Sequence, residues 1–291
     1  MCGRTACTLH PDDIRKCCTY TNQNGNKVVP QWINQDLYHP SYNLGPTRHS
    51  PVLTSNKNES ASFEDERILQ SMTWGLDIFG FGSKPTQVIN ARCETLLEKN
   101  TFKFPLKAGN RCVVLADGYY EWFRSGKVKE PHFFHMPQED GIVIHQAWKV
   151  EDDEKKRPHL LAMAGIYQKI KGDDEKYGYV VITVPASKAV EHVHDRMPAI
   201  LENENAIADW LNTGTIPAQK AIDQLKPIED IKHYRVSTCV NNVRNNTPEC
   251  IQPFINVDIK PRKPSVLEGW LIKRSAQVDT SAETCKKIKS E

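Results

Sequence analysis

A series of short strand-like segments joined by polar links most restricts how this chain folds. Apolar or alternating runs of this kind are typical of β-strands. They occur at Ser50–Leu53, Arg67–Leu76, Arg111–Leu115, Tyr119–Phe123, His132–His135, Ile142–Trp148, Leu160–Tyr167, Tyr179–Val184 and His233–Val240. Helical patterns are restricted to Pro11–Cys18, Glu202–Leu211 and Ala218–Leu225. We therefore expect a β-rich α+β domain with a few peripheral helices, not an array of βαβ units.

The composition changes near Pro253. A basic, proline-broken segment follows at Lys260–Pro264, and the remaining residues are rich in Lys, Ser, Thr and Glu. Such segments bury too little apolar surface to fold. We expect one domain over residues 1–253 and a disordered basic tail over residues 254–291.

Composition and cysteine usage narrow the classes of protein. The 291 residues are 39% hydrophobic and 25% charged, which is typical of a soluble globular protein. The net charge of +2 means that an anionic partner must meet a local basic patch. No apolar run is long enough to span a bilayer, and no secretion signal pattern occurs. Nine cysteines without a CxxC pair favour reduced thiols in cytosol or nucleus.

Two histidine pairs could be read as metal ligands. They are His132 with His135, and His192 with His194. Neither pair has further ligands nearby or zinc-finger spacing, so we expect no metal site.

Cys2 combines a thiol with a potential N-terminal amine. Residue 2 is small, so the usual removal of the initiator methionine would leave Cys2 first in the chain. An α-amine with pKa near about 8 and a thiol with pKa near about 8.5 are both reactive at neutral pH. Together they can capture an aldehyde, as an imine that the sulfur closes into a thiazolidine. The alternative is a frayed terminal residue, as chain ends usually are.

Three further segments place polar residues beside Gly, Pro or aromatic residues. Asn90 and Arg92 share one face if extended, although a surface strand with a solvated arginine would look the same. Glu121 stands between two aromatic residues, which would raise its pKa towards the range useful for acid–base catalysis; the alternative is a strand-edge charge. His194 and Arg196 also share a face if extended, which would place a proton-transfer group beside a phosphate binder.

These segments belong to a longer ordered set of motifs. They are Cys2–Arg4, Tyr42-Asn43-x-x-Pro46, Trp74–Leu76, Asn90–Glu94, Asp117–Trp122 and His194–Pro198. In this order they resemble the SRAP-domain proteins, the SOS-response-associated peptidase family, from about residue 2 to residue 253. The segment Val240–Cys250 is similar to the end of the domain in the eukaryotic branch of that family.

The resemblance implies a protein that crosslinks itself through Cys2 to abasic sites in single-stranded DNA and shields them at replication forks. A ring-opened abasic sugar is an aldehyde, which agrees with the aminothiol chemistry. By the same resemblance, His194 helps to open the sugar ring, and Glu121 acts as general acid–base and supports reversal of the crosslink. Asn90 would hold the sugar or the Cys2 backbone. No cofactor is implied.

The resemblance also assigns DNA contacts. Arginines would grip phosphates, and tryptophans would stack on bases, each stack being worth about 1–3 kcal/mol. The assigned residues are Arg4, Asn43, Pro46, Trp74, Arg92, Trp122, Arg196 and Met197. We expect a monomer that binds abasic single-stranded DNA and junctions of single- and double-stranded DNA, without a membrane.

One segment of this chain departs from the family pattern, and another lies in the tail. Relatives usually follow Trp-Gly-Leu with Pro and a second Trp, whereas this chain has Asp77–Gly82, in which Phe79 or Phe81 could fill the aromatic role. In the tail, Val266–Ile272 is either an accidental apolar patch or a motif for a replication sliding clamp. We expect nuclear localisation, with the cytoplasm as an additional location.

Two other functions remain open from the sequence. One is a Cys2-dependent peptidase, with removal of Met1 as an autocatalytic reaction. The other is a non-covalent reader of modified DNA containing 5-hydroxymethylcytosine. No base-reading helix or basic stripe supports the reader.

Overall fold

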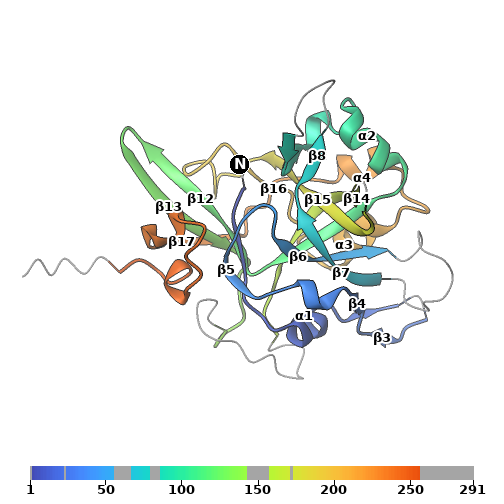
Figure 1. The fold of residues 1–291 in the computed structure, drawn as a ribbon, viewed down its shortest axis with the longest axis horizontal. Coiled ribbons are helices and arrows are strands. Elements are labelled where there is room, and N and C mark those ends of the chain that lie inside the picture. Colours follow the sequence, from blue (N-terminus) through green and yellow to red (C-terminus); the bar gives the residue numbers. More distant parts are fainter. Residues whose placement is uncertain are drawn as a thin grey trace, which may run out of the picture. The chain divides into compact units, whose positions relative to one another are not determined.

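A small β-barrel lies at the centre of the fold (Figure 1). The computed structural model describes residues 2–22, 24–55, 67–78, 86–142, 157–170 and 173–255. The barrel strands, in spatial order, are β15 (Asp173–Pro185), β14 (Leu161–Ile170), β11 (Arg111–Ala116), β6 (His49–Ser55) and β7 (Arg67–Trp74). Parallel pairing of Gly178 with Thr73 and of Tyr179 with Trp74 joins the two end strands and closes the ring.

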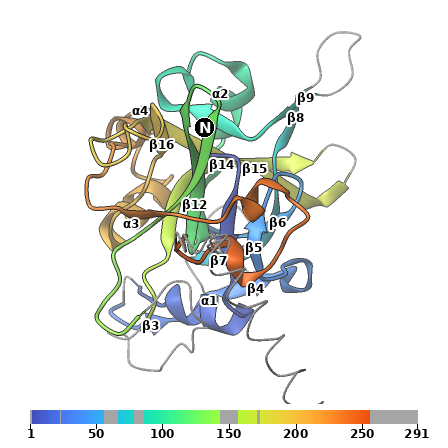
Figure 2. The same cartoon turned by 90° about the vertical axis from the view of Figure 1, so that its left-hand side faces the viewer.

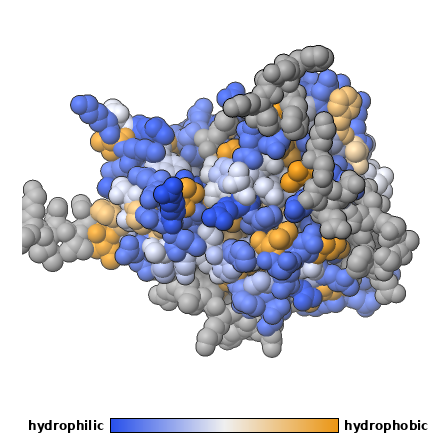
Figure 3. Space-filling view, viewed as in Figure 1, coloured by the Kyte–Doolittle hydropathy of each residue, from blue (hydrophilic) through white to orange (hydrophobic). Residues whose placement is uncertain are grey.

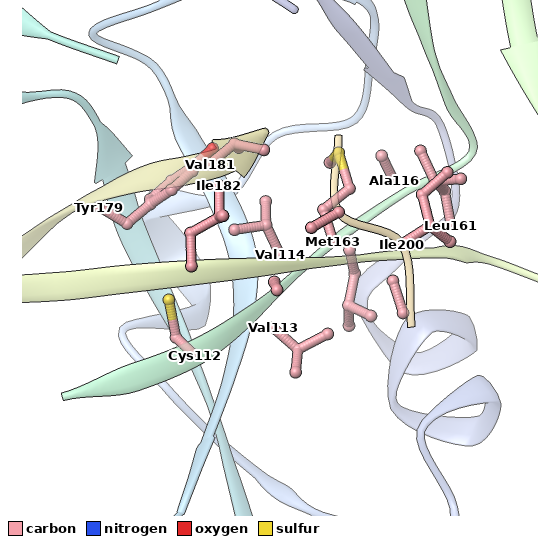
Figure 4. Packing of buried hydrophobic residues seen from close by; sticks show 14 of the residues in the cluster. Cys112, Val113, Val114, Ala116, Leu161, Met163, Tyr179, Val181, Ile182 and Ile200 are labelled. Atoms are coloured by element: carbon pink, nitrogen blue, oxygen red, sulfur yellow. The ribbon is translucent and has the colours of Figure 1, made fainter. Parts of the chain in front are cut away.

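The apolar run of β11 forms a strand that is buried on both faces. Val113 and Val114 point to opposite faces, yet their exposed fractions are 0% and 2%. Figure 4 shows these side chains packed with residues of β14 and β15. Helix α3 (Glu204–Leu211) also contacts β11, where the Trp210 indole donates a hydrogen bond to the Cys112 carbonyl over 2.8 Å. Continuous rather than alternating hydrophobicity is the expected pattern for such a strand.

Three short strands extend the barrel sheet. β10 (Asn90–Arg92) pairs in parallel with β15, and β16 (Arg196–Pro198) pairs antiparallel with it. β4 (Gln31–Ile33) pairs in parallel with β7. The strands that carry Asn90 and Arg196 therefore meet the same end of β15.

A second antiparallel sheet contains the N-terminal strand. Its order is β17 (Lys232–Arg235), β13 (Val128–His135), β12 (Gly118–Ser125), β1 (Thr5–Cys7) and β5 (Ser41–Leu44). Figure 2 shows the N-terminal strand running beside β12. The chain passes from the barrel strand β11 into β12 at Asp117. This buried carboxylate accepts hydrogen bonds from the backbone N–H and the hydroxyl of Thr8, over 2.8 and 2.6 Å.

The remaining elements are short and connect or cover the sheets. The other helices are α1 (Pro11–Cys17), α2 (Asn100–Lys107) and α4 (Ala218–Asp223). The other strands are β2 (Tyr20–Thr21), β3 (Lys27–Val28), β8 (Leu76–Ile78) and β9 (Thr86–Val88). The 3₁₀ turns are η1 (Gln35–Leu37), η3 (Cys93–Thr95), η5 (Thr238–Asn241) and η6 (Pro248–Cys250). None of the described helices is long and apolar enough to cross a membrane.

The β-rich α+β class predicted from the sequence is confirmed, two strand boundaries are corrected, and one helix is added. The strand expected at His233–Val240 ends at Arg235, because the Ser237 hydroxyl accepts from the Cys239 N–H and starts η5. The run Arg67–Leu76 breaks at Gly75, whose φ of +130° suits glycine. Helix α2 was not predicted, since it is short and contains Pro105. Residues 143–148, Phe79, Phe81 and the 256–291 tail lie outside the described residues.

The surface facing the viewer in Figure 3 is largely hydrophilic, and its hydrophobic residues occur in small separate groups. By its internal contacts, the stretch Met1–Phe254 forms one compact unit.

Candidate functional site

Cys2 is held inside the domain rather than at a frayed end. Its exposed fraction is 1%. The Asn90 side-chain amide donates a hydrogen bond to the Cys2 carbonyl over 2.6 Å, and the Cys2 thiol makes a long contact of 4.0 Å with the Arg4 carbonyl. The expectation that the N-terminal segment is tucked into the domain is confirmed.

Strand pairing explains why this segment is ordered. Thr5 pairs with Tyr119 of β12 on one side and with Leu44 of β5 on the other. The Tyr120 N–H also donates to the Arg4 carbonyl over 2.9 Å. An inner strand has neighbours on both edges, so its backbone polar groups are satisfied. Figure 1 shows this segment between the β12–β13 hairpin and β16.

Asn90 is positioned by β10 and by Trp74. The Trp74 indole donates a hydrogen bond to the Ile89 carbonyl over 3.0 Å, and its ring stacks on Tyr179 with centroids 6.2 Å apart. Trp74 is fully buried. The stacking surface predicted for Trp74 is therefore not exposed in this structure; instead, its ring fixes the residue that precedes Asn90.

Glu121 lies close to Cys2 and is 4% exposed. The pKa of the Cys2 thiol is well above its usual value. Burial of the side chain is the larger cause, and the charge of the Glu121 carboxylate is the second. The thiol is thus neutral at pH 7. Tyr119 and Glu121 are two apart on β12 and share a face. Among the described residues, the buried Tyr119 hydroxyl has no hydrogen-bond partner, and its pKa is raised by burial and then by charge at Cys2 and Glu121.

Sequence reasoning did not select Tyr119 as a site residue. The sequence signal for Tyr119 was its position two residues before Glu121, which places both side chains on one face of a strand. The sequence could not show that a buried hydroxyl faces the same site.

His194 lies two residues before β16, and its ring is oriented by its own segment. The Arg196 N–H donates to His194 Nδ1 over 3.0 Å, and an Asp195 carboxylate oxygen lies 3.0 Å from the same nitrogen. β10, which carries Asn90, and β16, which begins two residues after His194, both pair with the end of β15.

Arg196 is paired within the protein. Its guanidinium donates to both carboxylate oxygens of Glu94, over 2.5 and 3.0 Å, and to the Thr183 carbonyl over 2.6 Å. This bidentate contact lowers the pKa of Glu94 to about 2. A DNA phosphate that bound Arg196, as predicted, would thus have to compete with the Glu94 carboxylate that already binds this guanidinium. Glu94 stands in the same motif as Asn90, but no role was predicted for it.

Arg4 and Asn43 bind a returning loop, here called the 240–246 loop (residues Val240 to Asn246). Arg4 donates to the Asn43 side-chain oxygen over 2.7 Å and to the Val240 carbonyl over 2.9 Å. Asn43 is buried, and its amide donates to the carbonyls of Val240, Asn242 and Asn245. Asn43 is therefore placed as an internal clamp of this loop.

Trp122 is half-buried at the edge of the same loop. Its indole donates to the Asn241 side-chain oxygen over 2.6 Å. The Arg4 guanidinium lies 5.9 Å and the Lys129 ammonium 5.1 Å from the ring centroid. Both are cation–π contacts, so a base that stacks on this ring must compete with a cation.

The other three predicted DNA contacts differ in exposure. Arg92 is exposed, and its guanidinium has no hydrogen bond or ion pair with the described residues. Pro46 is half-buried. Met197 is 1% exposed, and its sulfur lies 3.4 Å from the Ser187 N–H, so it is not placed to touch DNA directly.

A basic pocket beside the 240–246 loop was not predicted from the sequence. It has a volume of about 190 Å³, and Asn43, Arg48, His49 and Arg244 are among its lining residues. Its two arginines, Arg48 and Arg244, come from segments almost two hundred residues apart, and no sequence pattern links them.

The histidines considered as metal ligands pack on aromatic neighbours. Nδ1 of His132 lies 3.3 Å from Nδ1 of His233, and the His192 ring lies 4.9 Å from the His233 ring. Burial, and then His233, lower the pKa of His132 to about 4. Across the described ranges, no group of three or more His, Cys, Asp or Glu side chains could hold a metal ion.

The fold and the site define a class of protein: a barrel-containing β domain in which a buried cysteine, Cys2, is held by an asparagine beside a carboxylate. Sequence comparison agrees with this class. The chain belongs to the SOS response associated peptidase (SRAP) family, whose model matches residues 1–243.

The similar proteins align with most of this chain. The abasic site processing protein HMCES of Xenopus tropicalis is 42% identical over 266 residues, which covers 88% of this chain and 79% of that protein. The HMCES protein of Gallus gallus is 41% identical over 286 residues, covering 93% and 84%. The abasic site processing protein YoqW of Bacillus subtilis is 30% identical over 264 residues, covering 87% and 99%.

A solved structure shows the same fold. A protein from Bacteroides thetaiotaomicron superposes with a TM-score of 0.60 at 20% identity, and the match covers 87% of this chain and 100% of that one.

Proposed function

We propose that this protein processes abasic sites in single-stranded DNA by forming a covalent thiazolidine between Cys2 and the ring-opened sugar. The observation that carries the proposal is the confinement of Cys2: it is 1% exposed, its carbonyl is held by Asn90, and it lies beside Glu121. The names of the relatives, which describe abasic site processing, support the choice of substrate. The reaction requires that Met1 be removed, so that Cys2 has a free amine.

The covalent step balances without a cofactor. The Cys2 amine adds to the aldehyde carbon of the open sugar, and the carbinolamine loses water to give an imine. The Cys2 sulfur then adds to the imine carbon, while its proton passes to the nitrogen. We assign these proton transfers to Glu121, the carboxylate whose charge acts on the Cys2 thiol.

The neutral Cys2 thiol supports this order of events over a cysteine peptidase. A peptidase nucleophile needs a thiolate, usually made by a nearby cation or histidine. Burial and the Glu121 carboxylate instead raise the pKa of the Cys2 thiol, and its sulfur contact is the Arg4 carbonyl. A neutral thiol suits late addition to an imine that the amine has formed. Peptidase chemistry is then limited to the removal of Met1.

The proposed DNA path uses the exposed cation of β10. Arg92 is two residues from Asn90 on the same strand and is exposed, so it is the arginine best placed to bind a phosphate next to the reacting sugar. Arg4 and Trp122 border the site but are engaged with the 240–246 loop.

The wider role follows from the same chemistry. We propose action at single-stranded DNA and at junctions, as a monomer, in the nucleus. A sliding-clamp contact through Val266–Ile272 stays a prediction, because these residues lie outside the described ranges.

A direct test uses a uracil-containing single-stranded oligonucleotide treated with uracil glycosylase. Protein whose intact mass shows loss of Met1 should give a stable shifted band and a mass equal to protein plus DNA minus one water. Cys2→Ala should give no stable adduct. Cys2→Ser keeps the amine, so it should give only an imine that borohydride traps. Glu121→Gln should slow formation by on the order of 10²-fold.

Cys17→Ser, at a half-buried cysteine of α1, is the matched control and should react like wild type. A Cys2→Ala protein that gave the same stable adduct would refute the proposal. Cys2-dependent cleavage of peptides in place of an adduct would favour the peptidase.

A further inference from the structure

Two cysteines outside the reactive centre lie in direct contact. The Cys239 thiol is 3.7 Å from the Cys250 sulfur, and the two residues are eleven positions apart. A disulfide needs sulfurs about 2 Å apart, so a small side-chain movement would join them. Both are free thiols in this structure. Cys239 lies in η5 and Cys250 in η6, two turns that pack together at the end of the domain.

The segment between these cysteines contains the 240–246 loop, which holds site residues. Its carbonyls accept hydrogen bonds from Arg4 and Asn43, and its Asn241 side chain accepts from the Trp122 indole. The Asn245 amide donates back to the Cys239 carbonyl over 2.8 Å. A bond between the two sulfurs would close a ring around this loop.

The two thiols differ in a way that suits stepwise oxidation. Cys239 is half-exposed, whereas Cys250 is fully buried and its thiol contacts the Asn245 carbonyl at 3.7 Å. Burial raises the pKa of the Cys250 thiol. An oxidant from solvent therefore meets Cys239 first, and Cys250 is the resolving partner within reach.

We infer that Cys239 and Cys250 form a reversible redox modification site, which peroxide oxidises to a disulfide that staples the 240–246 loop. Peroxide transfers an oxygen atom to the Cys239 sulfur as its O–O bond breaks, giving a sulfenic acid and water. The Cys250 sulfur then attacks the Cys239 sulfur, and the hydroxyl leaves as a second water. Two thiols and one peroxide thus give one disulfide and two waters. A dithiol reductant restores both thiols.

The test is a titration of the full-length protein with hydrogen peroxide, followed by intact mass and a non-reducing peptide map. The expected product has lost two hydrogen atoms, contains a Cys239–Cys250 linked peptide, and returns to the starting mass with dithiothreitol. Amide hydrogen exchange across Val240–Asn246 should slow in the oxidised form, because the ring restricts local opening. This readout does not depend on Cys2 chemistry, so it stands apart from the proposed function.

Two serine variants complete the experiment. Cys239→Ser changes a half-exposed residue and should abolish the linked peptide and the slower exchange. Cys17→Ser should retain both. Over-oxidation of Cys239 to sulfinic acid with a free Cys250 thiol would overturn the inference, as would a disulfide between other cysteines or unchanged exchange in the linked form.

Discussion

Individual residues of the candidate site separate into a group around Cys2 and residues whose contacts lie elsewhere. Cys2, Asn90 and Glu121 are brought together around one buried sulfur. The arginines differ in their surroundings: Arg196 is bound to a carboxylate, whereas Arg92 is exposed. A guanidinium already paired with a carboxylate gains little from a phosphate, since that carboxylate repels the new anion.

This division predicts different results for two arginine variants. Arg92→Ala should weaken binding to single-stranded DNA and reduce the slope of log affinity against log salt by about 0.7, the value for one phosphate contact. Arg196→Ala should mainly lower thermal stability, since it leaves Glu94 without its partner. Fluorescence anisotropy across a salt series, with thermal melts alongside, separates the two. A larger change of salt slope in Arg196→Ala than in Arg92→Ala would contradict the assignment.

Asp117 gives a pH-dependent prediction at the same scale. Burial raises the pKa of Asp117 to about 7 in the folded protein. The folded state therefore binds this proton more tightly than the unfolded chain, and the associated stability is lost as pH rises from about 4 through 7. The stability of wild type relative to Asp117→Asn should fall across that range and level off above it. Urea melts at several pH values measure it; a difference that rises with pH would contradict it.

At the scale of elements, the 240–246 loop joins the end of the domain to its beginning. Arg4 and Asn43 donate to its carbonyls across more than 190 positions of sequence. A loop outside a β-sheet has no ladder of backbone hydrogen bonds, so its carbonyls depend on contacts of this kind. The loop therefore supports Arg4 and Trp122 at the edge of the site, and its own position depends on Asn43.

Asn43→Ala should release this loop. The change leaves three carbonyls without their shared donor, at a cost of about 1–3 kcal/mol in unfolding free energy. Adduct formation should slow, because Arg4 also loses an acceptor. Asn24→Ala, at an exposed turn, is the control and should leave both unchanged. Equal stability of the two variants would show that the loop does not depend on Asn43.

At the scale of the whole molecule, closure of the barrel decides where the site residues lie. The seam between β7 and β15 is parallel and brings Gly178 against Gly75. A Cβ on Gly178 would lie 2.5 Å from the Gly75 carbonyl oxygen, closer than atoms can approach. The same seam places Trp74 beside Tyr179. The Trp74 indole in turn holds the Ile89 carbonyl, just before β10.

Gly178→Ala should therefore destabilise the barrel by about 1–3 kcal/mol, as overpacked sites do. Its neighbour across the ladder, Gln168, is only half-buried, so Gln168→Ala should have a much smaller effect. Chemical denaturation measures both. A free energy of unfolding of Gly178→Ala equal to that of Gln168→Ala would show that the seam tolerates a side chain.

The sequence by itself determined the β-rich class and most of the described strand and helix positions, and it named Cys2, Asn90, Glu121 and His194 as candidate site residues. The hydrophobic periodicity of strands and helices and the aminothiol chemistry of Cys2 are local, so they leave patterns in neighbouring residues. Only the tertiary structure decided that Trp74 and Met197 are buried, that Glu94 binds Arg196, and that one loop clamps Arg4. These contacts join residues far apart in the chain and have no period, so only barrel closure and burial could select them.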